Sequence, residues 1–271
     1  MRENKKRRIG LKIFLTILVL LSMGFISPLK VTKYNIHSST LPKEFDGYKI
    51  VQISDFHCKE FGNNEDSLIR AVKKLNPDII FLTGDIVDED HTVENADYLI
   101  SGLVDVAPMY YVTGNHEYYG GAPYDEFKEL CIKYGVDILD NETREIEKDG
   151  AKIKISGLDW QKIFANMKDV LGYADQSYFN ILLCHDASKF NFISEYGYDI
   201  VFSGHIHGGL VRIPIKGGVF GSDYSFFPKY DYGVYHDKNS IMVCSSGLGD
   251  ARIPRWNNPR EVVFVKLHRD E

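Results

Sequence analysis

Several common sequence patterns are missing from this chain of 271 residues. Its four cysteines form neither a C-x-x-C pair nor a zinc-finger spacing, which excludes a thiolate-rich metal site. No G-x-x-x-x-G-K-[ST] motif is present, so nothing indicates work driven by nucleotides. The chain also lacks internal repeats, low-complexity tracts and any basic run beyond residue 12. Because broad nucleic-acid binding needs a Lys/Arg footprint, we expect no nucleic-acid partner.

The composition is that of one large globular α/β domain. Hydrophobic residues make up 44% and charged residues 26% of the chain, and its length allows a sizeable core. The formal net charge is −6, but the first twelve residues hold six basic side chains against one acid, so the rest carries −11. Cys184 and Cys244 lie in apolar runs and are expected to be buried. If the domain is exported, a disulfide between two of the cysteines is an alternative that the sequence leaves undecided.

An apolar segment follows the basic N-terminus. Residues 13–29 are uncharged and nearly long enough to cross the hydrocarbon core of a bilayer, about 30 Å thick. We expect a single-pass transmembrane anchor; a cleaved signal peptide and an interface-bound helix are the alternatives, and a twin-arginine export route stays open. The basic excess places the N-terminus in the cytoplasm and the body on the outer side of the cell membrane. The expected parts are residues 1–12, a basic cytoplasmic terminus; 13–29, the anchor; 30–47, a juxtamembrane connector; and 48–271, the folded domain.

Five polar motifs each follow an apolar run that is typical of a strand. They are Asp55-Phe56-His57, Gly84-Asp85, Gly114-Asn115-His116-Glu117, His185 and Gly204-His205-Ile206-His207. The apolar runs that precede them are residues 49–54, 78–83, 109–113, 179–184 and 199–203. Because the carboxyl ends of buried parallel strands form a site along one sheet edge, we expect the motifs to meet there. Oxygen and imidazole ligands suit borderline divalent metals rather than a soft thiolate site.

Helical and hairpin signals fill the stretches between these runs. The hydrophobic periodicity predicts helices near residues 64–76, 93–106, 123–134 and 187–196. Alternating residues around Asp149-Gly150 predict a hairpin over 143–156. The C-terminal apolar runs are typical of antiparallel strands.

The order of the motifs resembles that of the calcineurin-like metallophosphoesterase superfamily: D-x-H, G-D, G-N-H-[DE], a lone His and G-H-x-H. The resemblance covers roughly Lys49 to the C-terminus. The chain also resembles a branch of membrane-attached bacterial phosphodiesterases, through Gly84-Asp85-Ile86-Val87-Asp88, Gly208-Gly209 after the last motif, and Pro254-Arg255. This likeness implies an α/β fold of four layers, αββα, in which helices sandwich two sheets.

The resemblance also implies a dinuclear centre for two divalent metal ions, such as Mn, Fe or Zn. The ligands it assigns are Asp85 as the bridge, then Asp55, His57 and His207 for one ion, and Asn115, His185 and His205 for the other. His116 would be the catalytic histidine that is not a ligand, stabilising the transition state or protonating the leaving oxygen. Glu117 could orient it or be an exposed residue at the start of a helix.

Three further features leave alternatives open. Asp88 belongs either to the surroundings of the metal ligands or to the solvated surface. Arg212 and Arg255 either clamp a substrate phosphate or pair with acidic residues. The aromatic segment 219–232 roofs the site, touches lipid or is a packed connector, and the last is slightly favoured.

The function expected from these features is that of a membrane-anchored, dinuclear-metal hydrolase. It would cleave phosphodiester or pyrophosphate bonds by a metal-activated hydroxide. Anchoring favours a lipid, an envelope polymer or an exported nucleotide as the substrate, without choosing among them. Two alternatives are a phosphomonoesterase, acting for example on phosphoprotein, and a scaffold without catalysis. The scaffold is disfavoured because all the ligand positions and His116 are filled.

Overall fold

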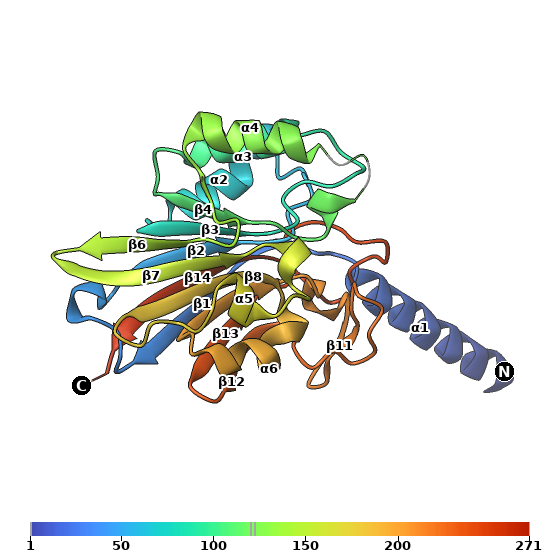
Figure 1. Cartoon of the computed structure of the whole chain (residues 1–271). Coiled ribbons are helices and arrows are strands. Elements are labelled where there is room, and N and C mark those ends of the chain that lie inside the picture. Colours follow the sequence, from blue (N-terminus) through green and yellow to red (C-terminus); the bar gives the residue numbers. More distant parts are fainter. Residues whose placement is uncertain (1, 120, 122, 271) are drawn as a thin grey trace.

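The computed structural model describes residues 2–119, 121 and 123–270. Two six-stranded sheets form the body, and a hairpin, β10 (Val211–Ile213) with β11 (Gly217–Phe220), lies beside them (Figure 1). In pairing order, the first sheet holds β1 (Leu29–Ser38), β14 (Arg260–Arg269), β2 (Lys49–Ile53), β3 (Ile79–Thr83), β4 (Met109–Val112) and β5 (Asp137–Ile138). The second holds β12 (Gly233–Asp237), β13 (Ser240–Cys244), β9 (Ile200–Gly204), β8 (Phe179–Asp186), β7 (Ala151–Leu158) and β6 (Thr143–Lys148).

Helices connect the strands. The α-helices are α1 (Arg2–Met23), α2 (Asp66–Lys73), α3 (Glu94–Leu103), α4 (Tyr124–Tyr134), α5 (Met167–Val170) and α6 (Phe190–Ile193). Single turns of 3-10 helix include η3 (His116–Tyr118), η4 (Trp160–Lys162), η5 (Ala187–Lys189), η6 (Ser194–Tyr196) and η7 (His207–Gly209). Two more, η1 (Lys43–Phe45) and η2 (Asn63–Glu65), precede β2 and α2.

Three hydrophobic cores show how the layers are stacked. The first core lies between α2, α3 and α4 and the outer face of the first sheet. The second fills the space between the sheets, where the rings of Phe81 and Phe202 lie 5.1 Å apart. The third joins the outer face of the second sheet to α5 and α6. The order is therefore helices, sheet, sheet, helices, and the mixed α/β architecture expected from the sequence is confirmed (Figure 1).

The strands before the polar motifs are largely apolar because both of their faces are buried. In β3, Ile80 and Leu82 point into the first core, while Ile79 and Phe81 point into the second. Strands β2, β3 and β4 are parallel to one another, as are β7, β8, β9 and β13. Each parallel set therefore delivers its carboxyl ends to one edge.

Most of the predicted helices, strands and hairpins are present, with two differences. The expected helix over 187–196 is a run of short turns, η5, α6 and η6. Strand β13 pairs in parallel with β9, whereas β12 and β14 take the antiparallel pairings expected at the C-terminus. The hairpin of β6 and β7 turns at Asp149 and Gly150, whose φ angles of 52° and 84° suit a tight hairpin turn.

Residues 30–47 are not the connector that we expected. Strand β1 begins at Leu29 and pairs over ten positions with β14, at the edge of the first sheet. Its Ile36 is buried in the core between the sheets. The sequence LKVTKYNIHS alternates apolar and polar residues, a signal that indicates a strand. The folded body therefore starts at Leu29 rather than at residue 48.

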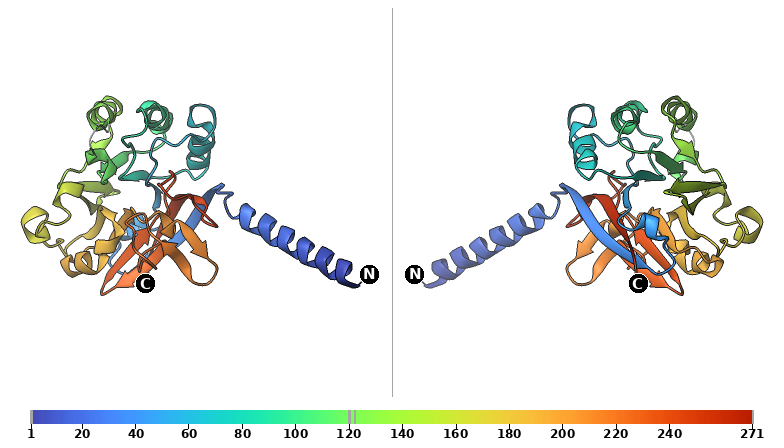
Figure 2. Two further views of the ribbon diagram at one scale, coloured as in Figure 1. Left: turned by 90° about the vertical axis from the view of Figure 1, so that its right-hand side faces the viewer. Right: turned by 90° about the vertical axis from the view of Figure 1, so that its left-hand side faces the viewer.

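The transmembrane helix expected over residues 13–29 is not supported by the structure. Helix α1 ends at Met23, and Leu29 already belongs to β1. The helix is basic over its first half, so its uncharged part runs only from Ile13 to Met23. Among the described residues, no helix combines the length and the apolar character needed to cross a membrane. Helix α1 projects from the body (Figures 1 and 2). Its apolar side chains, such as Phe14 and Ile17, are exposed.

Candidate metal centre

The five polar motifs converge where the carboxyl ends of the two sheets meet. Asp55 and His57 follow β2, Asp85 follows β3, and Asn115 follows β4. From the second sheet, His185 lies near the end of β8, and the segment after β9 carries His205 and His207. Residues far apart in the chain thus become neighbours, such as His57 and His207, which are 150 positions apart.

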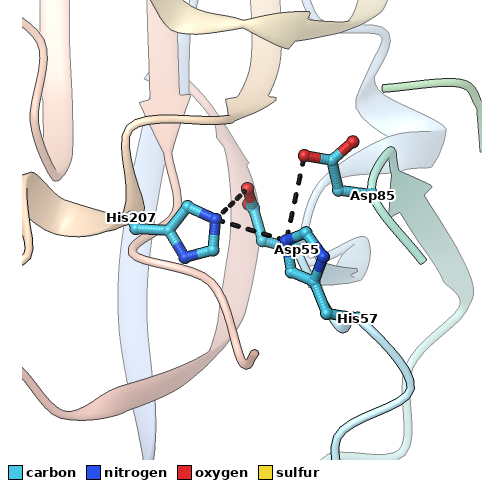
Figure 3. A group of neighbouring side chains, drawn as sticks. All are labelled: Asp55, His57, Asp85 and His207. Atoms are coloured by element: carbon cyan, nitrogen blue, oxygen red, sulfur yellow. Dashed lines mark hydrogen bonds and ion pairs between the residues drawn. The ribbon is translucent and has the colours of Figure 1, made fainter. Parts of the chain in front are cut away.

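Two groups of side chains could each hold a metal ion. In the first, ligand atoms of Asp55, His57, Asp85 and His207 all lie within 4.8 Å of one another (Figure 3). In the second, the same holds for Asp85, His185 and His205. Asp85 is common to both groups, which is the arrangement that a bridging carboxylate requires.

Short contacts within these groups bring their acceptor atoms together. Nε2 of His207 lies 3.2 Å from Oδ1 of Asp55 and 3.3 Å from Nε2 of His57. In the second group, Nε2 of His185 lies 3.0 Å from Oδ2 of Asp85. These residues are almost completely buried.

Two buried polar atoms of the candidate ligands lack a hydrogen-bond partner within the protein, and both fit a metal ion. They are Oδ1 of Asn115 and Nε2 of His185. Although Nε2 of His185 is close to Asp85, the contact has the distance of an ion pair without hydrogen-bond geometry. A buried polar atom without a partner is costly, and a coordinated ion would satisfy both atoms. The donor set of carboxylate, amide and imidazole suits Mn, Fe or Zn.

The backbone at the candidate ligands is strained. Asp55, His57, Asp85, His205 and His207 have φ angles of 48°, 49°, 51°, 74° and 49°, in the left-handed region. Each residue held there costs of order 1–3 kcal/mol, which the surrounding structure must offset. A left-handed residue directly after a strand turns the chain sharply, so His205 and His207 can face different groups although they are two positions apart.

Neighbouring peptide groups orient the two carboxylates. The backbone N–H of His116 donates to Oδ1 of Asp85 at 2.8 Å, and that of His205 donates to Oδ1 of Asp55 at 3.0 Å. Gly114 permits the close approach, because a Cβ atom there would collide with the Asp85 carboxylate. Each carboxylate therefore keeps one orientation.

The buried charges shift the pKa values of Asp85 and His185 in opposite directions. Burial lowers the pKa of His185, but the Asp85 carboxylate outweighs it and raises this pKa to about 10. Burial raises the pKa of Asp85, but His185 and His57 outweigh it, so the pKa falls well below its ordinary range. Without ions, the two side chains are therefore an ionised pair. A metal ion must displace the proton of His185 before it can bind there.

Groups around the ligands fix the orientation of their rings. Nδ1–H of His185 donates to the carbonyl oxygen of Thr83 at 2.7 Å, which leaves Nε2 to face the second group. Oδ2 of Asp88 lies 3.3 Å from Nδ1 of His57, and its Oδ1 bonds to His91. Of the two readings of Asp88, the structure thus favours a place beside a candidate ligand.

His116 lies at the partly exposed side of the first group. Its ring packs at a right angle to that of His57, with centroids 4.6 Å apart. Nδ1 bonds to Oε2 of Glu89 at 2.7 Å, so Nε2 remains for a substrate oxygen. Glu117 does not orient His116; it is buried and accepts from the N–H groups of Asp85, Ile86 and Gly114. The orienting acid is therefore Glu89, which the sequence analysis missed.

Both predicted arginines make contacts within the protein, although Nη1 of buried Arg255 has no hydrogen-bond partner there. Arg212 pairs with Asp231 at 2.8 Å and also donates to the carbonyl of Gly208. Arg255 is buried, donates to Nδ1 of His207 at 3.1 Å and to the carbonyl of Gly249 at 2.9 Å. Arg212 thus has an acidic partner, as the structural alternative requires, whereas Arg255 contacts a candidate ligand and a peptide carbonyl rather than an acidic residue.

Segment 219–232 combines features of the alternatives considered for it. The hydroxyl of Ser222 donates to the carbonyl of His205, so the segment lies beside the second group. Tyr230 is buried in the third core, whereas Phe226 and Phe227 are 73% and 59% exposed. The segment is therefore packed at one end and exposed in its middle.

Trp160 also borders the second group and was not recognised in the sequence. Its ring centroid lies 5.2 Å from that of His205 and 5.9 Å from that of His185. The signal was present, because Asp159-Trp160 directly follows β7, as the metal-site motifs follow their strands.

The fold and the site together define a metal-dependent hydrolase of the two-sheet α/β type. The chain belongs to the calcineurin-like phosphoesterase family, whose profile matches residues 48–209. Membership implies a metal-dependent phosphoester hydrolase, which agrees with the clustered Asp and His side chains.

Among curated relatives, the uncharacterized metallophosphoesterase YkuE of Bacillus subtilis is 31% identical, over 83% of this chain and 80% of its own length. An uncharacterized metallophosphoesterase of Aquifex aeolicus is 32% identical, over 88% of this chain and 92% of its own. Among solved structures, a dimetal phosphatase from Danio rerio is similar, with a TM-score of 0.47, 10% identity, and coverage of 82% of this chain and 93% of that one.

Proposed function

We propose that this protein is a dinuclear-metal hydrolase that cleaves phosphodiester or pyrophosphate bonds. The observation that carries the proposal is the pair of ligand groups that share Asp85. Two divalent ions, when bound, lower the pKa of a water molecule and neutralise charge on the phosphoryl oxygens. Asp55, His57, His207 and Asp85 would hold one ion, and Asp85, Asn115, His185 and His205 the other.

The chain's own residues supply the rest of the chemistry. His116, oriented through Nδ1 by Glu89, presents Nε2 toward the partly exposed side of the site and would donate a proton to the leaving oxygen. The strained backbone and the peptide N–H groups hold the ligands in place before substrate arrives, so little reorganisation is needed.

The surroundings favour a diester over a monoester. A phosphomonoester carries about one more negative charge than a diester and is commonly held by an arginine fork. Here Arg212 and Arg255 are both engaged within the protein. A singly charged phosphodiester needs no such clamp beyond the two ions.

Kinetics on matched esters test this proposal. We expect a higher kcat/KM on bis(p-nitrophenyl) phosphate than on p-nitrophenyl phosphate, with both activities lost on removal of metal. The reverse preference would establish the phosphomonoesterase alternative. No activity on either ester, with two ions bound per chain, would favour the scaffold.

We also propose that the chain is attached to a membrane surface through α1. The support is its exposed apolar side chains, such as Phe14 and Ile17, next to the exposed basic residues Arg7, Arg8 and Lys12. Burying apolar area and pairing basic groups with anionic lipids both favour binding at a lipid surface. The sequence analysis placed the body on the outer side of the membrane on the assumption that residues 13–29 span it. That orientation therefore stays a prediction. Attachment is compatible with a lipid or envelope substrate.

A further inference from the structure

An aromatic side chain borders the second ligand group, although hydrolysis itself does not require one. Trp160 packs against His205 with its ring tilted by 49° and against His185 with its ring nearly perpendicular, at 71°. The indole is partly exposed, and so is His205. Trp160 thus extends the site outward from the histidines that would hold the second ion.

Trp160 is held in a fixed position relative to this group. Its backbone N–H donates to Oγ1 of Thr113 at 2.9 Å. Buried Asp159 accepts from the same hydroxyl at 2.8 Å and from the N–H of Gln161 at 2.8 Å. Thr113 directly precedes the Gly114-Asn115 motif. The indole is therefore tied to the strand end that carries a candidate ligand, and little entropy would be lost when a ligand stacks on it.

Two further side chains continue this side of the site. The ring of Phe164 lies 6.5 Å from that of Trp160, at an angle of 81°, and Phe164 is 77% exposed. Nζ of Lys189 lies 4.4 Å from the centre of the Phe164 ring and 3.8 Å from Oδ2 of Asp186. An aromatic side chain so exposed next to a candidate active site, with an ammonium group over it, is suited to a ligand that is both planar and anionic.

We propose that Trp160 and Phe164 form a subsite for the base of a nucleoside carried by the phosphate ester, with Lys189 attracting its negative charge. The proposal rests on the proposed hydrolase function, because the subsite adjoins the second ligand group. Every nucleobase has a flat aromatic face, so stacking on aromatic rings does not depend on which base is present or on its hydrogen-bonding edge. The subsite therefore fits nucleoside phosphates as a class. An acyl chain would instead favour aliphatic side chains, whereas this side offers two aromatic rings and a cation.

A binding experiment tests the subsite without catalysis. The chain has two tryptophans, so Trp256→Phe leaves Trp160 as the sole one. Titration of this variant with uridine 5′-monophosphate should quench its fluorescence in a saturable manner, with and without added Mn²⁺. Ribose 5-phosphate, which lacks the base, should bind at least about 10-fold more weakly. Equal binding of the two probes, or no quenching by either, would overturn the proposal.

Kinetics separate the subsite from the hydrolase function. With Phe164→Ala, we expect KM for thymidine 5′-(p-nitrophenyl phosphate) to rise about 10-fold, while methyl p-nitrophenyl phosphate is unaffected. Phe192→Ala is the matched control, because Phe192 is 44% exposed and packs on Tyr196 rather than on Trp160. Equal loss on both esters would show that Phe164 only supports the fold and would overturn the subsite. If neither ester is hydrolysed by the wild type, the hydrolase proposal fails, and the fluorescence titration still decides whether the base binds.

Discussion

At the scale of single residues, the site depends most on Asp85, because its carboxylate belongs to both ligand groups. Replacement by Asn leaves the side-chain volume nearly unchanged but removes the negative charge that two cations would share. We expect Asp85→Asn to lower kcat by more than about 100-fold, beyond the loss typical of a group that only supports a ligand. Steady-state kinetics with elemental analysis of the purified variant measure both effects.

Asp88→Asn is the control for this change, because Asp88 contacts the ring of His57 without belonging to either group. Circular dichroism should show that both variants fold. An Asp85→Asn enzyme with near wild-type turnover and full metal content would refute the bridging role.

A second prediction at this scale concerns the pair of His116 and Glu89. His116→Ala should lower kcat by about 10²–10⁴, the usual range for a general acid, and retain both ions. Glu89→Gln should lower kcat by less, because it keeps a hydrogen-bonding group near Nδ1 but loses the charge. Adding the two changes together should cost no more than His116→Ala alone, since Glu89 acts only through His116. Loss of an ion in His116→Ala would instead identify His116 as a ligand.

At the scale of the elements, the pairing of β1 with β14 predicts that the fold needs β1, although the sequence suggested that residues 30–47 were only a connector. A chain that begins at Ser27 keeps all ten pairs between β1 and β14, whereas one that begins at Thr40 loses them together with the buried Ile36. Removing the strand exposes β14 and opens the core between the sheets. We expect the Ser27 form to keep its Tm and its activity on small diesters. The Thr40 form should aggregate or melt at least about 10 °C lower, since several kcal/mol are lost.

Equal stability of the two truncated forms, measured by thermal unfolding with the same metal content, would show that β1 contributes nothing to the fold. The matched point of comparison is the full chain, which differs from the Ser27 form mainly in α1.

The elements also show what could be read from the sequence and what could not. Buried parallel strands are largely apolar runs, so β2, β3, β8 and β9 were predicted, and the polar motifs after them were expected to meet at one edge. The division of these residues into two ligand sets came from the family resemblance. Strand β1 was missed because the apolar segment before it suggested a membrane anchor and made residues 30–47 look like its connector. The contact of Glu89 with His116 and the pairing of Arg212 with Asp231 depend on how separate segments of the chain fold together. Spacing along a sequence carries no signal for such contacts.

At the scale of the whole molecule, stability should depend on pH in a way that metal changes. The pKa of His185 in the ion-free protein is raised from 6.5 to about 10, so its contribution to stability is complete below pH 6.5 and is lost as the pH rises to 10. The metal-free protein should therefore melt at progressively lower temperature across this window. Metal affinity should rise over the same window, by about tenfold per pH unit for one displaced proton.

Scanning fluorimetry with and without a chelator measures both trends, and titration calorimetry in buffers of different ionisation enthalpy counts the protons released. His236→Gln serves as the control, because His236 lies on the exposed strand β12, outside both ligand groups. A metal affinity that does not change between pH 6.5 and 10 would contradict the ionised pair of Asp85 and His185.

The last prediction concerns helix α1, which leaves the body with its apolar side chains exposed (Figure 2). Residues at consecutive positions, such as Phe14 and Leu15, point to different sides of the helix and are 62% and 49% exposed, so α1 is apolar around its circumference. We expect the full chain to float with vesicles that contain phosphatidylglycerol, and the Ser27 form to stay in solution. A full chain carrying Leu15→Glu and Leu18→Glu should bind much more weakly, because it loses apolar burial and gains charge repelled by the anionic lipid.

All three forms should hydrolyse a small soluble diester at the same rate, because every candidate ligand lies beyond β1. Vesicle binding by the Ser27 form would place the attachment in the body rather than in α1, and a fall in its diesterase activity would show that α1 supports the site itself.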